Sequence, residues 1–118
     1  MRYLLLLAND NERIAAWEQL DPEEARRQRE AETPRWRELF RLMEERGSWV
    51  SGLELDVPRT AKTIREDGLV TDGPYAETKE QIGGYFVVEC ASLDEAIDLA
   101  ALVPVAETGS VEIRPIAQ

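Results

Sequence analysis

The sequence contains no histidine and only one cysteine, Cys90, among its 118 residues. Without histidine, the chain can form neither a Ser-His-Asp triad nor a histidine-ligated metal site. With one cysteine, it can form neither a disulfide within the chain nor a cysteine-based zinc site. Its paired acidic residues, such as Glu23 and Glu24, lie on expected helix surfaces and do not converge from a loop, as a hard cation requires. We therefore expect no metal and no cofactor, and any catalysis must use carboxylates, Tyr, Lys, Arg, hydroxyl groups or the backbone.

Basic residues and long apolar runs are also scarce. The chain has 14 Lys and Arg against 24 Asp and Glu, a formal net charge of -10. Phosphate groups are repelled by such a surface, which argues against nonspecific binding to nucleic acid and to anionic lipid. The most apolar run, residues 1–8, is far shorter than the roughly 20 residues that span a bilayer, and it lacks a signal-peptide cleavage site. We expect a cytoplasmic protein with a single domain over residues 1–118.

Helices are predicted where capping residues precede apolar residues at helical spacing. Residues 21–24, Asp-Pro-Glu-Glu, are typical of a helix start and open a highly charged, solvated helix that continues to residue 32. Pro34 follows a threonine and repeats the start signal, so a separate main helix is predicted over residues 34–46. Its apolar face is formed by Trp36, Leu39, Phe40 and Met43. A capping box at Ser92 and Glu95 predicts a final helix.

Strands are predicted from short apolar runs bounded by turn residues. They cover residues 1–8, 49–55, 85–90 and 111–114. The first of them is expected to be buried on both faces. Asp67-Gly68 is a strong hairpin signal between residues 60–66 and residues 69–71, and residues 76–81 could form one helical turn.

The order of these elements is strand, helix, strand, hairpin, strand, helix, strand. Two β-α-β halves joined through an inserted hairpin predict a ferredoxin-like α+β fold with the helices on one face of the sheet. The other face would then be uncovered, and strands as apolar as residues 85–88 would expose a large hydrophobic patch there. We therefore expect a homodimer that forms sheet to sheet.

The segment from Leu69 to Tyr85 resembles the signature of the DGPF-domain proteins, a branch of the YCII-related family. The name-giving Asp-Gly-Pro-Phe stands here as residues 72–75, with Tyr75 in place of Phe, and the Glu-Thr-Lys-Glu and Gly-Gly that usually follow are intact. The likeness extends from the N-terminal strand to the closing Val-Glu-Ile-Arg-Pro at residues 111–115, so it covers nearly the whole chain. It implies a subunit of the dimeric α/β-barrel group.

The same resemblance implies two kinds of function. Some relatives have a His-Asp pair proposed as catalytic, and the histidine of that pair is absent here. Many DGPF-domain proteins are similar to products encoded beside alternative sigma factors, for which a role in transcriptional regulation has been suggested. Family membership alone does not decide between these functions.

Asp72, Tyr75 and Glu77 are the candidate catalytic residues. Asp72 follows a strand end and could act as a general acid or base if burial or a neighbouring carboxylate such as Glu77 raised its pKa. Tyr75 could donate a hydrogen bond to an oxyanion. The structural alternatives are that Asp72 binds backbone N–H groups of its own turn and that Tyr75 packs as Phe would.

Four further residues are weaker candidates for ligand binding. Arg65 and Lys79, with the other basic residues around the hairpin, could attract a small anionic molecule, or they could simply solvate the hairpin edge. Gly83 and Gly84 could admit a ligand or the backbone of a second subunit, or they could form a bulge at the strand entrance.

Two hypotheses of different class remain. In the first, the chain is a regulatory or interaction module: a small acidic homodimer that acts on a protein partner such as a sigma factor. In the second, it is a cofactor-free enzyme or small-ligand binder that uses Asp72 as acid or base in a cleft at the dimer sheet.

Overall fold

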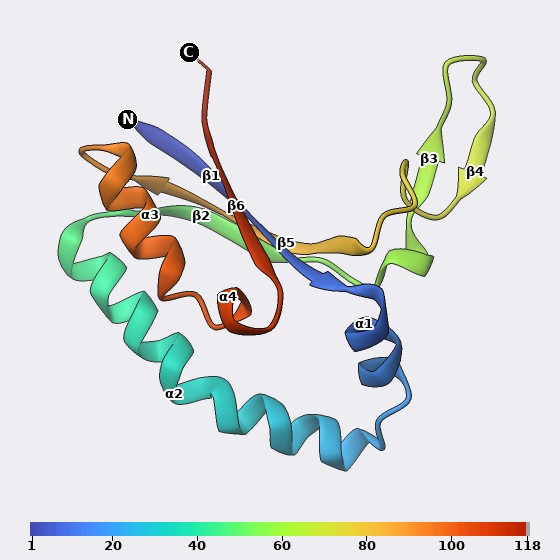
Figure 1. The fold of residues 1–118 in the computed structure, drawn as a ribbon, viewed down its shortest axis with the longest axis horizontal. Helices are drawn as coiled ribbons and strands as arrows, with labels where there is room; N and C mark the ends of the chain where they lie inside the picture. Colours follow the sequence, from blue (N-terminus) through green and yellow to red (C-terminus); the bar gives the residue numbers. More distant parts are fainter. Residues whose placement is uncertain (118) are drawn as a thin grey trace.

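A computed structural model describes residues 1–117 and shows a mixed α+β chain, with helices against one face of an antiparallel sheet (Figure 1). The four strands of this sheet lie in the order β2-β5-β1-β6, and each neighbouring pair is antiparallel. Their bounds are β1 (Arg2–Asp10), β2 (Trp49–Glu54), β5 (Glu80–Glu89) and β6 (Ser110–Pro115). Within residues 1–117 the sheet remains open, with β2 and β6 as its edges, and does not close into a barrel.

The remaining elements are four helices, one 3₁₀ turn and a two-stranded hairpin. The helices are α1 (Asn11–Glu18), α2 (Pro22–Arg46), α3 (Leu93–Ala101) and α4 (Val105–Thr108). The 3₁₀ turn η1 (Pro58–Thr60) leads into the hairpin of β3 (Lys62–Ile64) and β4 (Val70–Asp72). None of the helices within residues 1–117 combines the length and the hydrophobicity needed to cross a membrane.

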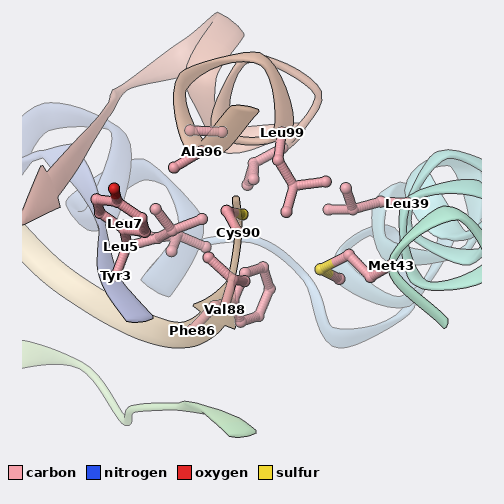
Figure 2. Packing of buried hydrophobic residues seen from close by; sticks show 12 residues of the cluster. Tyr3, Leu5, Leu7, Leu39, Met43, Phe86, Val88, Cys90, Ala96 and Leu99 are labelled. Carbon is pink, nitrogen blue, oxygen red and sulfur yellow. The ribbon is translucent and has the colours of Figure 1, made fainter. Parts of the chain in front are cut away.

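The hydrophobic core lies between the sheet and the helices α2 and α3. Alternation along β1 buries every second residue, and the β1–β5 register places Phe86 and Val88 on that same face. Figure 2 shows these side chains lying against Leu99 of α3 and against Leu39 and Met43 of α2. The buried residues of β1 are Tyr3, Leu5 and Leu7. The other face of β1 is only half-buried in the single chain, so the prediction of a first strand buried on both faces is not met by one copy.

The charged segment and the main helix predicted from the sequence are one continuous helix, α2. The prediction of a new helix start at Pro34 was wrong, because Pro34 lies inside α2. Pro34 has no N–H to donate to the Glu30 carbonyl, and Thr33 Oγ1 donates to the Arg29 carbonyl at 3.0 Å, a type of bond that often accompanies bending of a helix. Burial of Leu39 and Met43 stabilises the second half of the helix, and α2 follows a bent path in Figure 1.

Among the other local predictions, some were confirmed and others were wrong. The hairpin was confirmed: Lys62–Ile64 pairs with Val70–Asp72 around Gly68, which has φ +85°. The capping box was also confirmed, since Ser92 Oγ accepts from the Glu95 amide at 3.2 Å. The helical turn predicted over residues 76–81 was wrong: that segment is irregular until β5 begins. The helix α1 was not predicted; its first turn is capped by Asp10, which accepts from the Arg13 amide at 2.7 Å.

Candidate functional site

The face of the sheet that the helices do not cover has an apolar centre. By the strand registers, one set of alternate residues from β1, β2 and β5 points to this open face. The apolar and aromatic members of this open-face set are Leu4, Leu6, Ala8, Leu53, Ile82, Tyr85 and Val87, and Ser51 of β2 lies on the same face opposite Val87. Leu53 is 63% exposed and Ile82 is 41% exposed, so a contiguous apolar area meets solvent when the chain is alone.

One end of the open face is hollowed into a depression of about 550 Å³. Leu6, Ala8 and Ile82 supply its apolar lining. Its remaining lining residues are Asp10, Thr78, Lys79, Glu80, Ser110 and Glu112. One lysine therefore stands among three carboxylates, and this balance disfavours a small anion in the single chain.

All three carboxylates already have partners within the described chain, since Asp10 accepts from the Arg13 amide. Ser110 Oγ donates to Glu80 at 2.9 Å, and Arg114 donates to Glu112 at 2.5 Å. Within residues 1–117, no group of three or more Asp, Glu or Cys side chains is arranged to hold a metal ion. The depression is therefore an apolar hollow with a mostly acidic, internally bonded rim.

Asp72, the foremost catalytic candidate, lies on the hairpin and not in this depression. Its side chain is 85% exposed and forms an ion pair with Lys62, its cross-strand neighbour. The hydrogen bond from Lys62, together with its positive charge, lowers the pKa of the Asp72 carboxyl. A general base at neutral pH needs the opposite shift, so the single chain does not prepare Asp72 for proton transfer.

The rest of the Asp-Gly-Pro-Tyr segment folds back against the hairpin. Gly73 has φ +93°, and its amide donates to the Ala61 carbonyl at 2.8 Å. Thr63 Oγ1 donates to the Gly73 carbonyl at 2.8 Å, and Arg65 Nη1 donates to the Tyr75 carbonyl at 3.0 Å. These bonds connect the motif to β3 and fix the direction in which the chain leaves the hairpin.

The structure separates the other predicted site residues. Tyr75 is 76% exposed, and Glu77 is exposed in the irregular segment that follows it. Arg65 is occupied with the Tyr75 carbonyl and with Thr71, whereas Lys79 lines the depression. Arg65 and Lys79 therefore do not share one site in the single chain, and Asp72 has Lys62 as its charge partner.

Gly83 and Gly84 have distinct structural roles. The pairing of Leu7 with Gly84 and of Ala8 with Ile82 leaves Gly83 as the extra residue of a bulge. A Cβ placed on Gly84 would lie 2.9 Å from the Leu53 carbonyl oxygen, whereas a Cβ on Gly83 would meet nothing within 4 Å. The bulge predicted for this pair is therefore present, and close approach of this chain's own β2 explains the second glycine.

The open-face residues were missed as site candidates. A signal for them was present in the alternate apolar residues Leu4, Leu6 and Ala8, but a strand buried on both faces shows the same pattern. Cys90 is buried at the end of β5, and desolvation raises the pKa of its thiol, so it packs as a small apolar residue and is unsuited to act as a nucleophile.

Comparison with known proteins decides the family. The model of the YCII-related domain matches residues 1–118. The chain belongs to the YCII-related family. It is also similar to an uncharacterised protein of Rhizobium meliloti (strain 1021), with 39% identity over 123 residues that cover 99% of this chain and 93% of that protein. The two chains thus match over nearly their whole lengths.

Proposed function

We propose that this YCII-related chain is a homodimeric interaction module of the DGPF branch, with ferredoxin-like subunits that pair sheet to sheet as in the dimeric α/β-barrel group. The carrying observation is the apolar centre of the open face, where Leu6 and Val87 lie on neighbouring strands. The strand order β2-β5-β1-β6, with the helices on one side, supports the same arrangement. A second copy would remove this apolar area from water.

A charge on the open face tests this proposal. Leu6→Glu places a carboxylate near the centre of the face, whereas Ile97→Glu places one on the exposed side of α3. Light scattering of wild type and of Ile97→Glu at micromolar concentration should give the mass of a dimer. Leu6→Glu should give that of a monomer with an unchanged circular dichroism spectrum. A monomeric wild type would contradict the proposal.

We propose further that the dimer is regulatory and acts in the cytoplasm on a protein partner such as an alternative sigma factor. The net charge of -10 supports this, because proteins that bind DNA present basic surfaces to an acidic partner. The resemblance of the Asp72–Tyr75 segment to the DGPF signature supports it as well. Gel filtration of the dimer with an alternative sigma factor from the same genome should give one complex. Separate elution at ionic strengths from 50 to about 150 mM would count against this role.

The second candidate function is a small-ligand binder or cofactor-free enzyme. The observation in its favour is the depression of about 550 Å³, which a second copy on the open face would roof. In this function Asp72 of the hairpin would be the acid or base, and Tyr75 and Lys79 would contact the ligand. Asp72→Asn would then abolish ligand binding or turnover and leave the dimer intact. If it changes only the stability of the hairpin, the interaction module is favoured.

A further inference from the structure

One face of the β3–β4 hairpin is apolar and exposed. The register pairs Lys62 with Asp72 and Ile64 with Val70, and alternation puts both pairs on one face. Ile64 is 74% exposed and Val70 is 57% exposed, and neither belongs to the hydrophobic core. We call this surface, formed by Lys62, Ile64, Val70 and Asp72, the hairpin face.

The opposite side of the hairpin is already occupied by the chain itself. Thr63 bonds the Gly73 carbonyl, and Arg65 bonds Thr71 and the Tyr75 carbonyl. On the hairpin face, Lys62 and Asp72 pair with each other, and the apolar side chains of Ile64 and Val70 remain exposed. A two-stranded hairpin is at best marginally stable in water, so packing of its apolar side against another surface would stabilise it.

The hairpin also stands where a second copy is expected. Figure 1 shows it projecting from the end of the sheet on the side opposite α2 and α3, which is the side of the open face. The chain leaves β4 and reaches β5 through Thr78 and Lys79, which line the depression. The open face and the hairpin therefore border the same space.

The open face of the sheet is by itself smaller than the area that a stable dimer interface usually buries on each partner. The two edge strands have six residues and the two central strands nine and ten, so the strands span about 20 to 33 Å, and four of them span about 19 Å across, giving a flat footprint of roughly 500 Å². Stable specific interfaces bury about 800 Å² on each partner. Further surface on the same side of the molecule is needed to reach that area, and the hairpin offers apolar surface there.

We propose that the hairpin is a dimer clamp: Ile64 and Val70 of one copy pack against the second copy that covers the open face. This inference rests on the homodimer proposed above and assigns the hairpin a part in it. The Asp-Gly-Pro-Tyr segment then has the task of holding the hairpin at the angle that reaches the partner.

The test compares two isoleucines on opposite sides of the molecule. Ile64→Ser removes the apolar contact of the hairpin face, and Ile97→Ser makes the same change on α3. Sedimentation velocity over a concentration series gives the dimer Kd of each variant. Because each dimer contains two copies of the contact, Ile64→Ser should raise the Kd by about tenfold or more, and Ile97→Ser should leave it within about twofold.

Hydrogen exchange of the wild type provides a readout that needs no variant. Amides of residues 62–72 should exchange more slowly at concentrations above the dimer Kd than below it. The clamp is overturned if the wild type dimerises while Ile64→Ser keeps the wild-type Kd and hairpin exchange is independent of concentration. A wild type that remains monomeric throughout overturns the homodimer itself, and Leu6→Glu separates the two cases, because it disrupts any sheet-to-sheet dimer whether or not the hairpin takes part.

Discussion

Two adjacent glycines in β5 allow a matched test of the structure. Gly84→Ala adds a methyl group 2.9 Å from the Leu53 carbonyl oxygen, a backbone atom of β2. Gly83→Ala adds the same group one residue earlier, where nothing lies within 4 Å. Neither glycine has a positive φ, so alanine fits both backbone conformations and only the space around Cβ differs.

The expected changes in the free energy of unfolding have opposite signs. Gly84→Ala must move β2 away from β5 by a few tenths of an ångström, and overpacking of this kind costs about 1–3 kcal/mol. Gly83→Ala restricts the unfolded chain without strain in the folded one, which stabilises by about 0.4–1 kcal/mol. At several degrees per kcal/mol for a chain of this length, the two melting temperatures should differ by roughly 6–16 °C.

Thermal and urea unfolding of both variants, at one common protein concentration, provide the measurement. Equal melting temperatures, or a Gly84→Ala variant as stable as wild type, would refute the assignment of Gly84 to close packing of β2. A Gly83→Ala variant that keeps its stability but loses association would instead show that a second subunit approaches this glycine, the alternative left open by the sequence.

Two further predictions concern the hairpin and α3. Lys62→Met should raise the pKa of Asp72 toward its ordinary value of about 3.9, as followed by NMR titration of the carboxyl, whereas Lys79→Met should leave that pKa unchanged. The lowered pKa of Asp72 means that the ionised carboxylate stabilises the folded hairpin above about pH 4. This stabilisation should be lost as the pH falls through the Asp72 pKa, and the Lys62→Met hairpin should show no such loss. Ser92→Ala removes the acceptor for the Glu95 amide and should cost about 1 kcal/mol in urea unfolding, and an equally stable variant would show that this cap contributes nothing.

Signals that act within a few residues predicted this fold well. The capping box at Ser92 and the Asp67-Gly68 turn both involve partners close in sequence, so the order of a few neighbouring residues is enough to identify them. The single helix α2 was not predictable in the same way. Proline is a normal first residue of a helix, but burial of Leu39 and Met43 in the core allows the helix to continue through Pro34.

The helix α1 was missed because its cap residue, Asp10, was interpreted as part of a turn and because its other contacts come from distant residues. Asn9, Asp10 and Asn11 are typical of a turn, and no side chain of α1 is fully buried. In the folded chain, Arg29 of α2 stacks 5.2 Å from the centre of the Trp17 ring, and Glu18 bonds Arg59 at 2.7 Å. The residues around α1 in the sequence do not indicate such partners, which lie more than ten positions away.

The candidate site shows the same division between local and distant information. The Asp72–Tyr75 motif drew attention as possible chemistry because a carboxylate and a phenol stand three residues apart. In the structure, Asp72 pairs with Lys62 and Gly73 adopts a positive φ, while the Tyr75 carbonyl accepts from Arg65 and the Tyr75 side chain is 76% exposed. These contacts give the motif a structural role in the turn. They shift the search for function to surfaces that folding of one copy does not explain, namely the open face and the hairpin face, where apolar side chains remain in water until something covers them.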